Sequence, residues 1–304
     1  MPYPTPHFEK LVATLANEKL PETDRPRIEA AIERYHEWIT TSNALVIESE
    51  NPVQDLVAEL NRYRNYIDIE LVFDSPSDFL YRQKGQLKLD NSVLEEFLPR
   101  LVHPRILPEL GEAALQVGPI ACFSSAFFVS SLDVHTPDGG ISFRSKDQDF
   151  AIAKPMYIRA SHDPDFTGAE TKLTYLAYVA AECKTNLDKT MFQEACATAN
   201  DVKSSVTGAR YFLLCEWLDM TPLSTAPTDI DEVIILRKAK RLGSNVRAKF
   251  STAAGRTKSR DAYVEFLTKN PLHQDMFCRL VEHVRELLKN EAPVEANVLD
   301  LGYF

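Results

Sequence analysis

The sequence lacks the patterns that mark membrane insertion, secretion and disulfide cross-linking. No apolar run approaches the roughly 18 residues that a membrane span requires. The first ten residues lack the basic and then apolar order of a signal peptide. The five cysteines are odd in number and widely spaced, without a Cys-x-x-Cys pair. We therefore expect a cytoplasmic protein, not associated with membranes, whose cysteines are reduced and mostly packed in the core.

Motifs of several large hydrolase classes are also missing. The seven histidines show no metal-ligand spacing, and there is no glycine-rich phosphate loop and no Gly-x-Ser-x-Gly motif. Hydrolases that use zinc, an activated serine or nucleoside triphosphates are therefore disfavoured. With 44% hydrophobic and 26% charged residues, the chain of 304 residues still has the composition of an ordinary globular protein.

Positive charge is scarce overall but concentrated in one segment. The net charge of −10 argues against a protein that coats nucleic acid indiscriminately. Segment 237–260 nevertheless contains nine basic residues and no acidic one, namely Arg237, Lys238, Lys240, Arg241, Arg247, Lys249, Arg256, Lys258 and Arg260. Such a distribution would confine a bound polyanion to one face, and the alternative is a solvated basic loop.

The first part of the chain, residues 1–135, is predicted to be mainly helical. Apolar residues recur at helical spacing over 28–39 and again over 52–63, where Asn51 is a good N-cap. A shorter amphipathic stretch covers about 91–102. Helical segments therefore precede any sheet in this interpretation.

The pattern changes at the turn-rich cluster 135–140, after which β-type segments begin. Strands are predicted over 141–144, 150–158 and 173–185. Pro155 weakens the second of these, because proline cannot donate to a β-ladder and is confined to edges or bulges.

A helix over 187–202 and a buried strand over 209–217 follow the third strand. A strand, helix and strand within so few residues form a right-handed crossover, so these two strands should be parallel and adjacent. The sequence thus predicts an α/β (α+β) fold with a mixed sheet flanked by helices, and a nuclease-like core over 136–230. The remainder, 231–304, is predicted to be the basic segment and a helix that turns six apolar residues toward the core, namely Phe277, Leu280, Val281, Val284, Leu287 and Leu288.

The third predicted strand ends in a charged pair. Side chains alternate along a strand, so Glu182 and Lys184 share one face while Cys183 points the other way. A carboxylate beside an ammonium at the end of an apolar strand is costly, and a bound metal with a water to position is one reason to accept that cost. By chance, a chain of this length holds about one Glu-x-Lys triplet. A second copy, Glu170-Thr171-Lys172, begins the strand and is the less favoured alternative.

Hydrolysis of a phosphodiester at such a site needs a second acid, because two carboxylates are the usual minimum for Mg²⁺. The midpoint between positions 149 and 182 falls inside the polar turn 163–168, so an antiparallel hairpin would place Asp149 opposite Glu182. Asp147 and Asp165 are the alternatives. Asp165 lies in the turn, at the end of the strand remote from Glu182.

Four further polar residues are weaker candidates for the site. Gln193, on the helix after the strand, is expected to lean toward the metal site or a phosphate, with a solvated helix position as the alternative. Glu59 is a candidate for a further outer ligand of the metal, and a solvated surface position is the favoured alternative. Glu216 and Asp219, at the end of the last predicted strand, are candidates for orienting the lysine.

Two stretches, 181–195 and 210–220, resemble the BbvCI-like family of type II restriction endonucleases within the PD-(D/E)xK nucleases. The resemblance covers about 140–225 and is most specific in the run Glu182-Cys183-Lys184-Thr185, followed by Leu187-Asp188-Lys189. It implies a Mg²⁺-dependent enzyme that cuts double-stranded DNA at a short, near-palindromic site. Some members of the family pair two non-identical subunits, so a homodimer or a heterodimer is expected.

The resemblance also implies roles for the candidate residues. Asp149, Glu182 and the main-chain carbonyl of Cys183 would hold Mg²⁺, and Lys184 would position the attacking water. The basic residues of 237–260 would contact phosphates and read bases through arginine. Two other readings stay open: a nuclease that recognises DNA structure in repair or recombination, and a DNA-binding module without activity.

Overall fold

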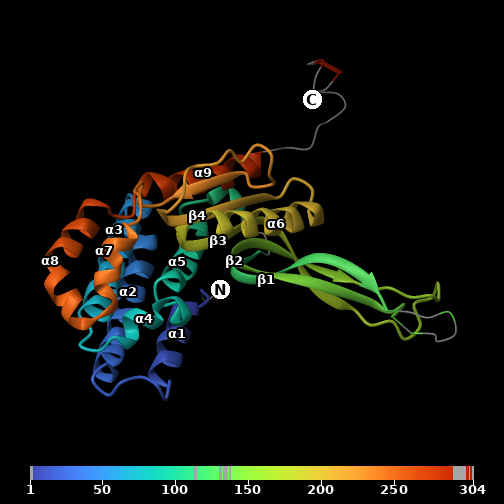
Figure 1. Cartoon of the computed structure of the whole chain (residues 1–304). Coiled ribbons are helices and arrows are strands. Elements are labelled where there is room, and N and C mark those ends of the chain that lie inside the picture. The colour runs from blue at the N-terminus through green and yellow to red at the C-terminus, as the bar shows by residue number, and fades with distance from the viewer. Residues whose placement is uncertain are drawn as a thin grey trace.

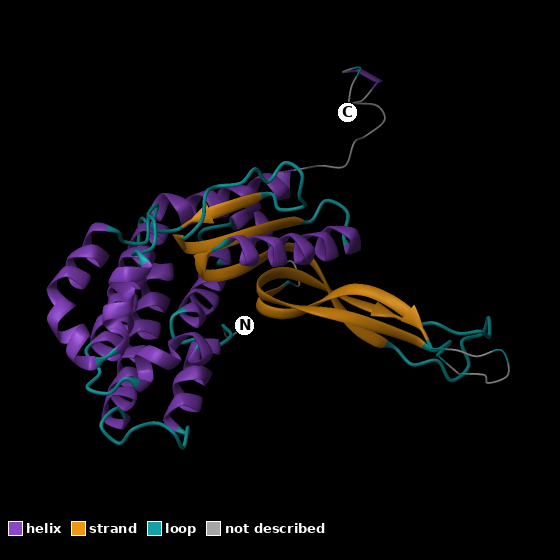
Figure 2. Ribbon diagram, viewed as in Figure 1, coloured by secondary structure: helices purple, strands orange, loops and turns teal. Residues whose placement is uncertain are grey.

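The computed structural model describes residues 3–111, 115–129 and 138–289, together with residues 132, 136, 299, 300 and 302. A bundle of helices covers one side of a five-stranded sheet, part of which projects away from the bundle (Figure 2). Over these described ranges, no helix combines the length and apolar character that a membrane span needs.

The N-terminal part is helical, as predicted. Its elements are α1 (Pro6–Leu15), α2 (Arg25–Glu48), α3 (Pro52–Asn65), the π-helix η1 (Tyr66–Phe73), α4 (Phe79–Leu87), α5 (Asn91–Phe97) and the 3-10 helices η2 (Leu98–Val102) and η3 (Pro108–Leu110). The predicted helices over 28–39 and 52–63 lie within α2 and α3, and the predicted stretch 91–102 is α5 followed by η2. The buried face of α2 includes Ile28, Ala31, Tyr35 and Trp38.

The sheet is mixed. Its strands are β1 (Gln116–Phe128), β2 (Ile141–Ile158), β3 (Lys172–Leu187), β4 (Arg210–Leu218) and β5 (Glu232–Ile235), in the order β1-β2-β3-β4-β5. The first three strands are antiparallel neighbours, and β3, β4 and β5 are parallel. Helix α6 (Lys189–Ser205) connects β3 to β4. The predicted fold class and the parallel, adjacent pairing of these two strands are confirmed.

Two details of the sheet differ from the sequence prediction. Strand β1 was not predicted, because Gly118 and Pro119 interrupt its sequence and normally argue against a strand. The structure places a register shift there, with Gly118 at φ 128° and close to Pro4, where a Cβ would lie 2.5 Å from a side-chain carbon. In addition, the predicted strands 141–144 and 150–158 are a single strand, β2, of 18 residues.

Strand β2 curves back on itself. Fully extended, its residues would span about 60 Å, yet Lys172, which pairs with the last residue of β2, donates to the carbonyl of Ile141, the first residue. Lys172 also forms an ion pair with Asp138 at 2.7 Å. The Ile141 end of the β1–β2 hairpin therefore meets the Ile158 end of the β2–β3 hairpin. Together they form a projecting β arm, which we define as residues 123–129, 138–145 and 154–174 (Figure 1).

The alternation of side chains along the strands builds two cores. Val179, Ala181 and Cys183 of β3 pack with the N-terminal helices, whereas Ala180 packs with α6 on the other face. This alternation is the one predicted for β3, and it places Glu182 and Lys184 on the α6 side. Pro155 pairs with Tyr175 beyond Ala153, the last residue of β2 that pairs with β1.

The basic segment is not a loop. After β5 the chain forms α7 (Ser244–Ala248), the 3-10 turn η4 (Lys249–Ser251), α8 (Ala253–Lys269) and α9 (Gln274–Lys289). Of the apolar residues predicted to face the core from α9, Phe277, Leu280, Val281 and Val284 are buried, and Leu287 is partly buried. The prediction is wrong for Leu288, which is 39% exposed.

Candidate active site

The predicted carboxylate pair lies where β2 meets β3. The pairing of Phe150 with Ala181 continues the register that the hairpin symmetry predicted, and this register brings Asp149 to the level of Glu182. The backbone N–H of Cys183 donates to Asp149 Oδ2 at 2.8 Å. Both acids are half-buried. Two residues that are 33 positions apart in the sequence thus share one site because of the strand register.

Glu182 is held at both of its oxygens. Lys184 Nζ lies 2.6 Å from Oε1, and the hydroxyl of the fully buried Tyr211 on β4 donates to Oε2 at 3.0 Å. Glu182 and Lys184 side chains are 19% and 27% exposed, so water reaches the pair. The tyrosine fixes the carboxylate without adding charge.

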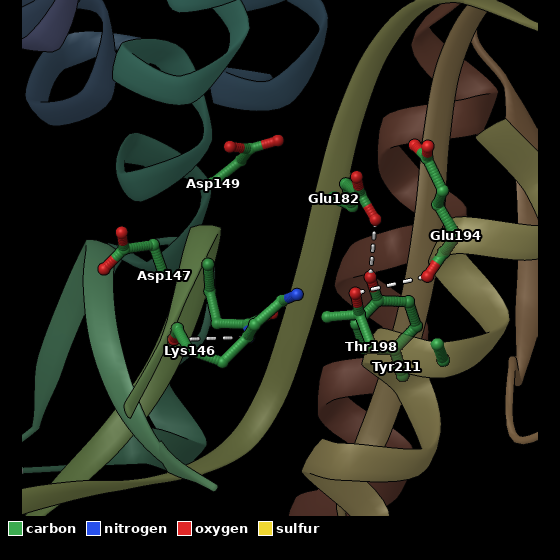
Figure 3. Close-up of a pocket in the computed structure, with 9 residues that line it drawn as sticks. Lys146, Asp147, Asp149, Glu182, Glu194, Thr198 and Tyr211 are labelled. Carbon is green, nitrogen blue, oxygen red and sulfur yellow. Dashed lines mark hydrogen bonds between the residues drawn. The ribbon is translucent and has the colours of Figure 1, made fainter. Parts of the chain in front are cut away.

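These residues line a cavity of about 330 Å³. We call it the carboxylate cavity; its lining residues are Lys146, Asp147, Gln148, Asp149, Glu182, Glu194, Ala197, Thr198 and Tyr211. Figure 3 shows the acids of β2 on one side of the cavity, and Glu194, Thr198 and Tyr211 on the other, beyond Glu182. Four of the lining residues are acidic, so the cavity is suited to a cation.

The closeness of these charged groups shifts the pKa values of Asp149 and Lys184. Burial raises the pKa of Asp149, and the negative charge of Glu182 raises it further, against the hydrogen bond from Cys183. Burial would lower the pKa of Lys184, but its hydrogen bond to Glu182 and the charges of Glu182 and Asp149 outweigh burial, so that pKa is raised. The lysine therefore stays charged, and the two acids repel each other.

Glu95 of α5 is a candidate that the sequence did not reveal. Its side chain is 8% exposed, and its Oε1 atom is buried without a hydrogen-bond partner. Burial and the charge of Asp149 raise the pKa of Glu95 to about 7. Helix α5 is fixed to β3 because the Asn91 side chain donates to the carbonyl of Cys183 at 2.6 Å. Nothing in the sequence marks Glu95, since it lies inside an amphipathic helix.

The cavity fits a magnesium ion better than a softer metal. Over the described ranges, no three His, Cys, Asp or Glu side chains form a ready-made metal cage. Mg²⁺ needs no such cage, because one or two carboxylates commonly hold it together with waters and substrate phosphate. Asp149 and Glu182 supply such hard oxygen ligands. The Cys183 carbonyl, the predicted third ligand, already accepts a hydrogen bond from Asn91.

The alternative acids are sorted by position. Asp147 lines the cavity beside Asp149. Asp165 is exposed in the turn of the β arm, where its N–H donates to Asp163, and the second triplet around Glu170 lies in the same arm. Neither Asp165 nor Glu170 lines the cavity.

The structure places several other candidates away from the cavity. Gln193 is exposed and does not line it; the residue of α6 that does is Glu194, so the predicted lean of Gln193 is wrong. Glu59 is buried and pairs with Arg62 on α3. Glu216 binds Arg64 and Arg237, and Asp219 binds Arg241, so neither orients Lys184.

Two of the nine predicted DNA-binding residues are structural instead. Arg237 is 1% exposed, binds Glu216 and the carbonyl of Asn270, and lies over the ring of Trp217. Arg256 is also 1% exposed and donates to four main-chain carbonyls, those of Phe73, Ser75, Ser77 and Phe250. Both guanidinium groups are buried, so DNA cannot reach them, and the prediction is wrong for both.

The other seven basic residues reach solvent but differ in their partners. Four form ion pairs: Lys238 with Asp275, Arg241 and Arg247 with Asp219, and Arg260 with Asp74. Lys240, Lys249 and Lys258 are exposed, and no ion pair links them to any residue in the described part of the chain. Of the nine basic residues of segment 237–260, only these three are exposed and have no ion-pair partner among the described residues.

Comparison with known proteins identifies the family. No curated protein sequence gives a significant match. A solved structure described as the native BbvCI A2B2 tetramer at low resolution aligns with a TM-score of 0.41 and 18% identity, over 86% of this chain and 96% of that one. The model of the Bpu10I restriction endonuclease family matches residues 86–304, which include the whole sheet and the carboxylate cavity. The resemblance to restriction endonucleases is therefore confirmed, and this chain belongs to the Bpu10I restriction endonuclease family.

Proposed function

We propose that this protein is a Mg²⁺-dependent type II restriction endonuclease that hydrolyses double-stranded DNA at a short specific site. The observation that carries the proposal is the meeting of Asp149, Glu182 and Lys184 at the junction of β2 and β3. Two carboxylates that repel each other, next to a charged amine, form a site for a divalent cation and a water molecule.

Asp149 and Glu182 would hold the ion through their carboxylate oxygens, with the Cys183 carbonyl as a further ligand where its second lone pair is free. Bound Mg²⁺ supplies charge stabilisation on the phosphate and an acidified water. Lys184 would donate a hydrogen bond that orients the attacking water. As the oxygen of this water bonds to phosphorus and releases a proton to solvent, the bond to the leaving sugar oxygen would break, and that oxygen would take up a proton from water. Tyr211 keeps the Glu182 carboxylate in position through its 3.0 Å hydrogen bond.

Cleavage of both strands in one binding event calls for two such sites. Each chain provides one carboxylate cavity in the described ranges, so we propose that the enzyme works as a homodimer or with a related subunit. Large apolar side chains near the end of the β arm support such pairing, because they are exposed in the single chain: Phe127, Phe128, Val129, Tyr157 and Leu173. Lys240, Lys249 and Lys258 remain candidates for contacts to DNA phosphates.

The test is incubation of plasmid DNA with Mg²⁺ and each of four variants. Lys184→Ala, Glu182→Gln and Asp149→Asn should each lower the cleavage rate about 100-fold or more, the scale of a lost transition-state contact. Asp165→Asn, the matched control in the turn, should cut like the wild type. Circular dichroism checks that each variant is folded.

The products distinguish the proposal from its rivals. Discrete bands, with a rate that rises more steeply than protein concentration, support a restriction enzyme that acts as paired subunits. Cuts only at junctions or flaps would indicate a nuclease that recognises DNA structure. A gel shift without cleavage would indicate a DNA-binding module, and full activity of folded Lys184→Ala would rule out the assigned site.

A further inference from the structure

A polar groove adjoins the carboxylate cavity and shares Lys146 with it. The groove has a volume of about 490 Å³. It lies between the base of the β arm and α6, and its lining residues are Ser124, Ser125, Arg144, Ser145, Lys146, Asn200, Asp201 and Ser204. We call it the β2–α6 groove. Figure 1 shows α6 running beside the strands from which the arm projects.

The groove differs in charge from the cavity. The cavity lining has four acids and one cation, whereas the groove lining has two cations, Arg144 and Lys146, and the single acid Asp201. Both cations are exposed, and neither has an ion-pair partner among the described residues. Arg144 lies over the ring of Phe127 at 5.7 Å, which leaves its N–H groups free to donate. Positive charge is thus available beside the acidic centre.

The two cations are placed for an extended anion. They are two positions apart on β2, so their Cα atoms are separated by about 7 Å along the strand. Four serines and one asparagine, which are typical partners of phosphate oxygens, surround them. The two sides of the groove are joined, because the Ser205 hydroxyl on α6 donates to the carbonyl of Ser124 on β1 at 2.5 Å. A sequence of cations and neutral donors that leads into a hydrolytic centre fits a phosphodiester chain.

We propose that the β2–α6 groove binds the phosphate backbone of the DNA strand that is cut, next to the scissile phosphate, through Arg144 and Lys146. This proposal rests on the proposed function, because it takes the carboxylate cavity as the place of hydrolysis. The groove would carry the strand into the cavity, and Lys146, which lines both, would contact the phosphate nearest to the scissile one.

The experiment measures binding of a labelled random-sequence duplex at several salt concentrations without divalent metal. Arg144→Ala and Lys146→Ala should each weaken binding and flatten the dependence of log K on log salt by about 0.9 unit, the value for one phosphate contact. Lys154→Ala, an exposed lysine of the same strand outside the groove, should leave the slope unchanged. Arg144→Lys should restore it. Melting temperatures check that all variants are folded.

The outcomes separate this proposal from the proposed function. If the wild type cuts plasmid with Mg²⁺ but both groove variants bind with an unchanged slope, the groove proposal is wrong while the function stands. An equal effect of Lys154→Ala would also overturn it, because the loss would then reflect overall charge. If the wild type neither binds nor cuts DNA, both proposals fail together.

Discussion

Two buried groups of carboxylates in this protein differ in their partners. Glu216 is fully buried between Arg64 at 3.0 Å and Arg237 at 2.9 Å. Burial alone would raise the pKa of Glu216, but the two arginines outweigh it and hold that pKa below its usual value. Asp149, which lines the carboxylate cavity, and Glu95, whose pKa responds to the charge of Asp149, have no arginine partner among the described residues, and burial raises the pKa of both.

The difference separates charges that hold the fold together from charges that are available for chemistry. Around Glu216, Arg64 of α3 binds Glu216 of β4 and Asp68 of η1, and Arg237, the second residue after β5, binds Glu216 and lies near Asp68. Around Asp149, like charges are held close by the packing of α5, β2 and β3, and a bound cation would relieve their repulsion. Acids with raised pKa values in a cavity are typical of functional sites.

The largest effect is expected from removing a paired arginine. Arg237→Ala leaves the buried Glu216 with one partner fewer, and loss of one member of a buried ion pair costs about 3–5 kcal/mol. Arg260→Ala, which removes an exposed pair with Asp74, should leave the free energy of unfolding almost unchanged. Urea unfolding of both variants is the measurement. Equal destabilisation of the two would contradict the structural role of Arg237.

Glu95→Gln is expected to have a smaller effect of opposite sign, because it should raise the free energy of unfolding of the metal-free protein. Glu95 ionises in the folded state at a pKa of about 7, against its usual 4.5, so its ionisation opposes folding. Below the usual pKa both states are protonated and the effect vanishes. As pH rises to about 7 the cost grows, and above that it is constant at about 3 kcal/mol.

The stability of Glu95→Gln should therefore equal that of the wild type at low pH and exceed it increasingly between these two pKa values. Unfolding free energies from urea titrations at several pH values test this. Glu170→Gln, an exposed acid of the β arm, is the control and should show no such trend. A flat difference for Glu95→Gln would mean that Glu95 is not held in a desolvated, acidic environment.

The smallest effect is expected from single exposed lysines of the basic segment. Lys240→Ala should weaken binding to all duplexes alike and flatten the salt dependence of log K by about one unit, if unpaired cations contact phosphates. Lys238→Ala, whose ammonium is already paired with Asp275, should change neither quantity. Binding titrations at several salt concentrations test this. Identical behaviour of the two variants would mean that ion pairing does not decide which lysines contact DNA.

Much of the fold followed from periodicity. The helical stripe predicted α2 and α3, and the alternation in β3 predicted which face carries Glu182. The unpredicted strand β1 shows where local rules fail: Gly118 and Pro119 argue against a strand, but a register shift and the close approach of Pro4 accommodate them. The single long β2 was divided in the prediction because its middle is a run of polar residues, which line the cavity.

The sequence by itself determined the meeting of Asp149, Glu182 and Lys184, because strand period and hairpin symmetry are local properties. Only the tertiary structure decided which other charges take part. Glu194 reaches the cavity through the packing of α6, and Glu95 of α5 lies close enough to Asp149 for that charge to raise its pKa. Arg237 and Arg256 are buried against acids and carbonyls from distant parts of the chain. Net charge along a segment carries no information about such partners, since pairing depends on residues far apart in the chain.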